Sequence, residues 1–271
     1  ESHINGDVFY KVRPSSGSTQ LIDGLGQIFL SQLNTFKVQD SIVRVRHKSG
    51  RTQSYYLDSL QWFNDGNRHQ ASGSLFVDGF SKNSISFVVD LYGQKRQDIF
   101  GQVYLQAQKM DVSPWLEQLI SEHVVITSSE ANFEAWAEIH NGLVDDIIIN
   151  VANSGIRWGD VSHDDKLLNV KSAQVHWQKV DENWSLFGND VTLADKNNVY
   201  DGFDFSLRSD ADYSQLDIGR FDLTSVSPLI SLFSLTKDLP ALSNSTFAGV
   251  VENIQVHWDD SGAPFVYSEI E

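Results

Sequence analysis

Residues 84–92 read Ser84-Ile85-Ser86-Phe87-Val88-Val89-Asp90-Leu91-Tyr92, and this stretch alternates between apolar and polar side chains. In an extended chain, successive side chains project from opposite faces. One face of the stretch would then carry Ile85, Phe87, Val89 and Leu91, and the other would carry Ser84, Ser86 and Asp90. A period of two is typical of a half-buried strand in an antiparallel sheet, so the stretch predicts a strand with one apolar face.

The same alternation recurs along most of the chain. It is clearest where Phe133, Ala135, Ala137 and Ile139 alternate with polar residues, and again at Phe203, Phe205 and Leu207. Turn clusters such as Asn64-Asp65-Gly66-Asn67 separate the segments and indicate a meander. Further strands are predicted at about 42–47, 55–63, 71–77, 99–108, 144–151, 173–178, 184–186, 216–221 and 250–258.

Composition limits the classes of function. The chain has 271 residues, with 41% hydrophobic and 21% charged, so it can form a core and is not intrinsically disordered. Its 20 basic and 36 acidic residues give a formal charge of −16, which argues against a nucleic-acid partner. No apolar run approaches the roughly 18 to 20 residues of a membrane span. The absence of cysteine excludes disulfides and thiolate metal sites.

Two short helices are predicted. In Ser113-Pro114-Trp115-Leu116, the serine occupies a favourable N-cap position and the proline the first helical position. Ser227-Pro228 repeats this start 114 residues later. We therefore predict helices at about 114–123 and 228–235, each following a strand.

A second repeat supports a modular organisation. Gln174-Val175-His176-Trp177 is echoed by Gln255-Val256-His257-Trp258, and residues 41–47 form a looser third copy. Repeated strand-and-helix units imply modules that bury their surfaces against one another. We expect one continuous segment, with a first module over residues 1–122 and a second over 123–271. Because the chain begins at Glu1 without a methionine, we also expect it to be part of a longer protein.

Motifs for catalysis are lacking, and no cofactor or metal is predicted. The sequence has no G-x-S-x-G elbow, phosphate-binding loop or H-E-x-x-H pair. Gly24-Leu25-Gly26 lacks the third glycine of a dinucleotide site, and His163-Asp164-Asp165 is better explained as a solvated turn. Glu134 and Glu138 would lie about 13 Å apart on a strand, beyond the roughly 5 to 9.5 Å carboxyl spacing of glycosidases.

The tryptophans allow a binding or a structural interpretation. His176-Trp177 and His257-Trp258 could stack on a ligand, but a tryptophan at a strand end more often fills or caps a core. The structural interpretation is favoured here, and for Trp115 and Trp136 as well.

Two short helices cannot cover the apolar face of about a dozen strands. Either two sheets cover each other in a closed β-sandwich, or the apolar face remains partly open and lines a groove. A sandwich would suit a module that binds carbohydrate or a protein partner, whereas a groove would suit an apolar ligand.

Several segments resemble a known family. They are Asp40-Ser41-Ile42-Val43-Arg44-Val45, Leu57-Asp58-Ser59-Leu60-Gln61-Trp62, Asn67-Arg68-His69, Ile99-Phe100-Gly101-Gln102-Val103-Tyr104-Leu105 and Met110-Asp111-Val112-Ser113-Pro114-Trp115-Leu116. Together they are similar to the periplasmic portion of AsmA-like proteins, and within that group to the YhdP branch. The resemblance is strongest over residues 33–122.

This resemblance implies a repeating β-groove, part of a large protein anchored to the inner membrane of Gram-negative bacteria by a segment outside this sequence. Such proteins are thought to carry phospholipid across the envelope, with acyl chains shielded in the groove. The implied partners are phospholipid acyl chains, neighbouring modules of the same chain and other envelope proteins.

The fold predicted from these observations is mainly β: a long, curved antiparallel sheet with two short inserted helices. Alternation alone selects the groove-lining residues, and a register shifted by one would select the opposite face. The predicted lining is Ile85, Phe87, Val89, Leu91, Val103, Leu105, Phe133, Ala135, Ile139, Phe203, Phe205 and Leu207. Trp115 and Phe233 are predicted to rim or plug the groove. The predicted function is non-enzymatic lipid transfer.

Overall fold

The strands follow one another with few interruptions in the computed structural model. It describes residues 30, 34–46, 52–77, 85–116, 124–160, 166–210, 213–225, 248–259 and 264–268. The strands are β1 (Thr35–Arg46), β2 (Thr52–Asp65), β3 (Arg68–Val77), β4 (Ile85–Tyr92), β5 (Phe100–Met110), β6 (Val124–His140), β7 (Leu143–Asp160), β8 (Lys166–Val180), β9 (Asn183–Ala194), β10 (Phe203–Ser209), β11 (Tyr213–Asp222), β12 (Val250–Asp259) and β13 (Pro264–Ser268). A 3₁₀ helix, η2 (Arg96–Asp98), and an α-helix, α2 (Ser113–Leu116), lie between strands.

All thirteen strands of the described ranges belong to one sheet, in which their order is their order in the sequence. Each strand pairs antiparallel with the strand before it. The long antiparallel sheet predicted from the sequence is therefore confirmed. The closed β-sandwich would require two facing sheets, whereas the described strands form one that is not closed into a barrel.

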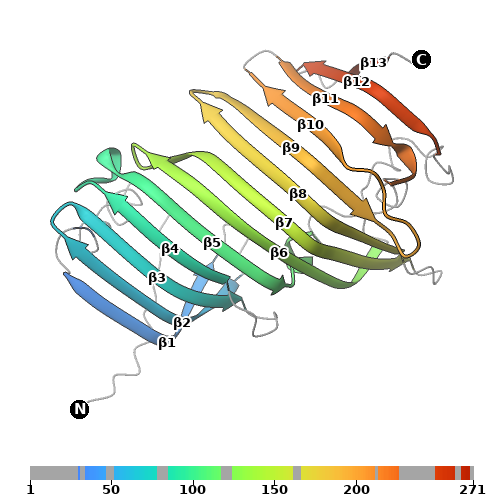
Figure 1. Cartoon of the computed structure of the whole chain (residues 1–271). Coiled ribbons are helices and arrows are strands. Elements are labelled where there is room, and N and C mark those ends of the chain that lie inside the picture. Colours follow the sequence, from blue (N-terminus) through green and yellow to red (C-terminus); the bar gives the residue numbers. More distant parts are fainter. Residues whose placement is uncertain are drawn as a thin grey trace.

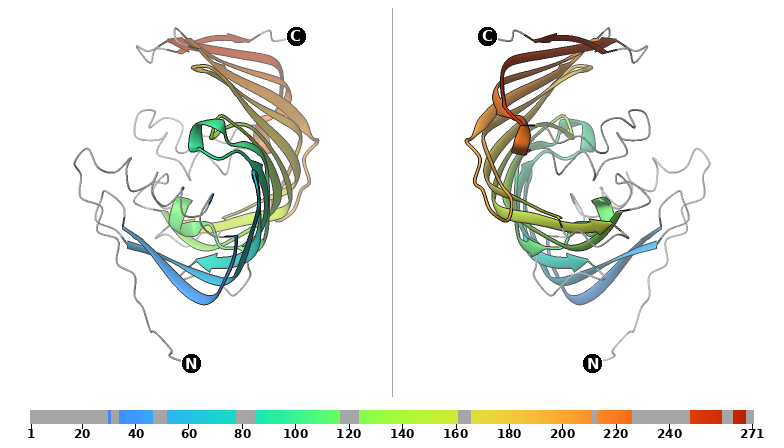
Figure 2. Two further views of the ribbon diagram at one scale, coloured as in Figure 1. Left: turned by 90° about the vertical axis from the view of Figure 1, so that its left-hand side faces the viewer. Right: turned by 90° about the vertical axis from the view of Figure 1, so that its right-hand side faces the viewer.

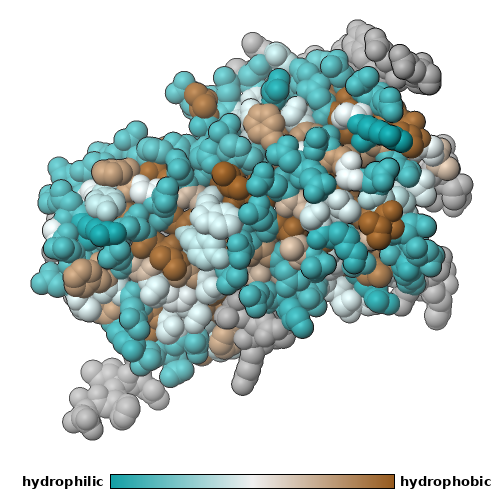
Figure 3. Space-filling model, viewed as in Figure 1, coloured by the Kyte–Doolittle hydropathy of each residue, from teal (hydrophilic) through white to brown (hydrophobic). Residues whose placement is uncertain are grey.

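The sheet is long and strongly curved (Figures 1 and 2). Seen from its ends, it has a concave and a convex face (Figure 2). Figure 3 shows the convex face, which is hydrophilic over most of its area. Along β6, side chains that point to opposite faces differ in their access to solvent, because Trp136 and Glu138 are exposed whereas Ala135 and Ala137 are half-buried.

β-bulges bend the strands across the middle of the sheet. The pairing register shifts within each of the pairs β5–β6, β6–β7, β8–β9 and β9–β10. Lys109, Asn153 and Asp190 adopt positive φ angles of 51°, 46° and 49° beside these shifts. The Asn132 side chain accepts a hydrogen bond from the Lys109 amide at 2.7 Å and donates one to the Asn153 carbonyl at 2.8 Å. Because a bulge bends its strand and increases the twist, these bulges contribute to the concavity of the sheet.

A small core lies where β7 to β10 approach the chain segment between β9 and β10. Trp158 is its largest residue and is only 1% exposed. The other buried members are Leu168, Ala173, Val191, Leu193 and Tyr200. Phe203 and Phe205 pack against this cluster, and the Phe203 ring contacts the Phe221 ring edge-on with centroids 4.7 Å apart.

Connections that follow odd-numbered strands all lie on one long side of the sheet, because consecutive strands are antiparallel. Helix α2 follows β5 on this side, and helical residues 223–225 follow β11 on the same side. We call this side the helix rim, and the opposite side, which carries the short hairpin turns, the turn rim. The start of the first predicted helix thus lies on the helix rim, whereas most of residues 114–123 and all of residues 228–235 fall outside the described residues.

The start of α2 differs from the prediction in its capping group. Ser113 is the first helical residue, and its hydroxyl donates to Asp111 Oδ1 at 2.6 Å instead of capping an amide. The Asp111 carboxylate accepts the Ser113 amide at 2.9 Å and the Ser129 hydroxyl of β6. Asp222 repeats this arrangement by accepting the Thr224 amide at 2.8 Å. The prediction that Ser113 caps this helix was thus wrong, because the Asp111 carboxylate, two residues earlier, accepts both the amide and the hydroxyl of Ser113.

The predicted module boundary at residues 122–123 falls between β5 and β6, which pair within the same sheet. The division into two modules remains a prediction.

Candidate functional site

The concave face is built from the apolar positions that the sequence singled out. Directly paired residues of neighbouring strands project from the same face of a sheet. Strand β4 is paired with β5 through Phe87–Leu105 and Val89–Val103, and β5 is paired with β6 through Leu105–Ala135. One face of these three strands therefore carries Ile85, Phe87, Val89, Leu91, Val103, Leu105, Phe133, Ala135 and Ile139.

The same face continues without a break towards β10. Ala135 pairs with Ile149, Ile149 with Val175, Val175 with Gly188, and Gly188 with Phe205. The remaining predicted lining residues, Phe203, Phe205 and Leu207, thus lie on the face shared by β4 to β6. All the predicted lining residues on strands are half-buried. Their role in binding a ligand remains a prediction.

Two glycines allow phenylalanine rings to lie flat on this face. A side chain at Gly188 would collide with the Phe205 ring, and a Cβ at Gly73 would come within 2.8 Å of Phe87 Cζ. Each glycine lies on an odd-numbered strand and each ring on the next strand. The concave surface is consequently covered by aromatic rings in places where the adjacent strand has no side chain.

Sequence reasoning missed further apolar residues of this face, although the same alternation marks them. Trp62 pairs with Ala71, and Ala71 with Val89, which places Trp62 on the concave face. Trp177 lies there too, opposite Ile147 and Leu186. Others on the face are Ile149, Val151, Val175, Leu216, Ile218, Ile254 and Val256. The Gln-Val-His-Trp echo therefore places valine and tryptophan on this face and histidine on the other.

The predicted rim or plug residues cannot be placed in the same way. Trp115 belongs to α2, but its side chain is outside the described residues, as is the whole of Phe233. Their role remains a prediction.

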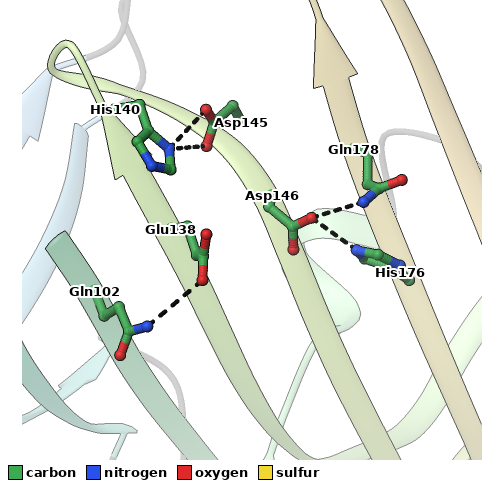
Figure 4. A network of polar contacts seen from close by, with 7 residues as sticks. All are labelled: Gln102, Glu138, His140, Asp145, Asp146, His176 and Gln178. Carbon is green, nitrogen blue, oxygen red and sulfur yellow. Dashed lines mark hydrogen bonds and ion pairs between the residues drawn. The ribbon is translucent and has the colours of Figure 1, made fainter. Parts of the chain in front are cut away.

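The convex face carries rows of polar side chains (Figure 4). Gln102 donates to Glu138 at 3.5 Å, and Asp146 Oδ2 accepts from Gln178 at 2.9 Å. The same Asp146 oxygen contacts His176 Nε2 at 2.8 Å. Partial burial opposes ionisation of Asp146, but these two hydrogen bonds outweigh it and lower the pKa of this carboxyl.

A second histidine contact lies at the turn rim. His140 Nδ1 is 2.8 Å from Asp145 Oδ2, and both side chains are exposed (Figure 4). The hydrogen bond to Asp145, with the charge of that carboxylate, raises the pKa of His140.

The convex-face carboxylates do not gather into a metal centre. Within the described ranges, no group of three or more His, Asp or Glu side chains could hold a metal ion. Residues 163–165, the histidine and aspartates weighed earlier, lie outside those ranges. Glu134 and Glu138 lie on the convex face of β6 and accept hydrogen bonds from Gln106 at 3.1 Å and Gln102 at 3.5 Å.

None of the helices in the described part of the chain combines the length and the hydropathy needed to cross a membrane.

The comparison with protein families covers nearly the whole chain. The profile of the YhdP protein family matches residues 3–270. The chain belongs to the YhdP family. The resemblance to the YhdP branch of AsmA-like proteins is thereby confirmed.

A YhdP-family relative is the protein of Escherichia coli (strain K12) described as "Intermembrane phospholipid transporter YhdP". It is 26% identical over 148 residues, which represent 53% of this chain. The match spans only 12% of the relative's length. No solved structure matches the chain.

Proposed function

We propose that this chain is a lipid-transfer segment whose concave face shields the acyl chains of phospholipids. The observation that carries the proposal is the continuous row of half-buried apolar side chains across β4 to β10. Membership of the YhdP family and the similarity to a phospholipid transporter support the same class of ligand.

Transfer of hydrocarbon from water to this face would provide the binding free energy. Each buried methylene contributes about 0.8 kcal/mol, so two acyl chains gain strongly without any specific polar contact. Such a site needs no catalytic group, and we propose a non-enzymatic role. The head group would remain in water beside the rims, where it would be free to move along the sheet.

We further propose that the segment acts in the periplasm as part of a longer protein anchored in the inner membrane. β1 and β13 lie at the two ends of the strand order. An edge strand presents unpaired amide and carbonyl groups, so these strands could pair with neighbouring modules of the same chain. The head-to-tail pairing would extend the apolar face.

The test uses two adjacent valines of β4 that face opposite ways. Val89 lies on the concave face, whereas Val88 lies on the convex face and is 50% exposed. Val89→Glu should abolish co-purification of phospholipid and uptake of a fluorescent fatty acid, because it places a charge among the apolar residues. Val88→Glu should leave both unchanged.

Mass spectrometry of denatured protein would measure the bound lipid, and circular dichroism would show whether each variant is folded. Wild-type protein that neither retains phospholipid nor takes up the fatty acid would overturn the proposal. The proposal would also be overturned if Val89→Glu and Val88→Glu were both folded and lost lipid equally.

A further inference from the structure

The convex face has an apolar stripe that lipid transfer in the concave face would not use. One residue on each of β4 to β9 contributes to it, and direct pairing makes the members neighbours. The convex stripe consists of Val88, Tyr104, Trp136, Ile148 and Phe187, with His176, which is hydrogen-bonded to Asp146, between the last two. Hydrophobic residues interrupt the hydrophilic surface of this face in several places (Figure 3).

Half of the residues of the convex stripe are exposed, and the stripe has defined ends. Trp136 is 40% exposed and Ile148 36%, in addition to the exposed Val88. Ser72 pairs with Val88 at one end, and Ser206 pairs with Phe187 at the other. Tyr104, His176 and Phe187 are half-buried: the Tyr104 ring packs on Trp136 with centroids 5.2 Å apart, the His176 ring contacts Phe187, and the Arg208 guanidinium lies over the Phe187 ring. An exposed apolar row bounded by polar residues is typical of an interaction surface.

Carboxylates and amides flank the convex stripe on both sides. Glu134 and Glu138 lie two residues before and after Trp136, and all three share the convex face. Gln106 and Gln102 hold these carboxylates by hydrogen bonds. On β5 to β8, the paired residues that flank the stripe are amides and the carboxylates Glu134, Glu138 and Asp146, without lysine or arginine. The flanks would therefore attract cationic groups.

From this arrangement we infer that the convex stripe docks a basic amphipathic helix of a partner protein. Six strands spaced about 4.8 Å apart give a stripe about 24 Å long, which matches about 16 helical residues at about 1.5 Å each. Glu134 and Glu138 are about 13 Å apart along β6, enough for a helix about 10 to 12 Å wide to pass over Trp136 between them. Lysine or arginine on either side of the apolar helix face would then meet the carboxylates.

Other occupants fit the surface less well. A second copy would bring carboxylates against carboxylates in a chain of net charge −16. The same charge disfavours nucleic acid and anionic membrane surfaces. A polysaccharide could stack on Trp136, but Val88 and Ile148 offer it neither a ring nor a hydrogen bond. Aliphatic and aromatic side chains together suit the apolar face of a helix.

The test uses two synthetic helices of 16 residues, with leucine along one face and either lysine or glutamate along its borders. The purified 271-residue chain should bind the lysine peptide and not the glutamate peptide, as measured by fluorescence anisotropy. Trp136→Ala should weaken binding at least about tenfold, as expected for a central aromatic anchor. Glu134→Gln combined with Glu138→Gln should weaken it several-fold and reduce its salt dependence.

Two controls separate this inference from the proposed lipid transfer. Leu143→Ser changes an exposed apolar residue outside the convex stripe and should leave peptide binding unchanged. Val89→Glu should reduce lipid content but not peptide binding. The inference would be overturned if the two peptides bound equally or if Trp136→Ala had no effect on binding in a folded chain. It would also be overturned if a neutral polysaccharide displaced the peptide, or if sedimentation equilibrium showed dimerisation through the stripe.

Discussion

Gly73 and Gly188 show how single residues shape the concave face. Neither has a side chain, so the rings of Phe87 and Phe205 lie over the neighbouring backbone. An aromatic residue beside a glycine covers the backbone that would otherwise contact water. A branched residue at either position would have to displace a ring that is already half-buried.

We expect Gly188→Val to destabilise the fold by about 1 to 3 kcal/mol, because it overpacks the contact with Phe205. Urea unfolding followed by circular dichroism would measure the change. Gly219→Ala is the matched control, since a Cβ at Gly219 would have no atom within 4 Å. If the two variants lost the same stability, the glycine–phenylalanine contact would not be the cause.

His140 should titrate above its ordinary pKa of 6.5, because the hydrogen bond to Asp145 favours the charged ring. A raised pKa in the folded state gives a contribution to stability that is complete below the unfolded pKa. That contribution is lost as the pH rises through the folded pKa. NMR titration of the His140 ring protons would measure the shift, and Asp145→Asn should return the pKa towards 6.5. An unchanged titration in Asp145→Asn would contradict this account.

At the scale of elements, the start of α2 depends on Asp111. Hydrogen bonds from Ser113 and Ser129 tie the end of β5 to both α2 and β6. Burial opposes the negative charge of Asp111, but these bonds outweigh it and lower the pKa of the carboxyl. A lowered pKa gives stability that is present above the unfolded pKa and is lost as the pH falls through the folded pKa.

Asp111→Ala should therefore cost about 1 kcal/mol or more at neutral pH, the usual loss for removal of a helix cap. The loss should shrink in acid, where the wild-type carboxyl is protonated. Ser113→Ala should cost less, because its hydroxyl donates to Asp111 and caps no amide. Urea unfolding at pH 7 and at a series of acidic pH values below the unfolded pKa of 3.8 would compare the variants; a greater loss in Ser113→Ala would favour the serine cap predicted from the sequence.

Alternation identified the strands and their faces, as at Phe87 and Phe133, because burial on one side of a sheet acts on every second residue. It could not locate the bulges. Asp190 occupies an extra position in β9, and its left-handed φ of 49° depends on pairing with both neighbouring strands. The general preference of tryptophan for cores favoured a structural role for Trp136, whereas this residue is exposed on the convex face, as its alternation with Ala135 and Ala137 implies. Local sequence does not encode which apolar side chains the rest of the fold will cover.

At the scale of the whole molecule, the two faces should respond differently to a lipid ligand. The proposed site places acyl chains near Trp177 on the concave face and far from Trp136 on the convex face. Phospholipid brominated on its acyl chains should therefore quench tryptophan fluorescence. Trp177→Phe should reduce the quenched fraction, and Trp136→Phe should increase it by removing an unquenched emitter. If Trp136→Phe reduced the quenched fraction instead, the lipid would lie on the convex face, which would contradict the proposed site.

The strand order has a consequence for how such a protein acquires its size. Every strand that the structure describes pairs only with its neighbours in the strand order, so duplication of one hairpin would lengthen the sheet without changing any other strand pairing. Each added hairpin would extend the sheet by about 10 Å, twice the strand spacing. Evolution could in this way change the length of the sheet one hairpin at a time.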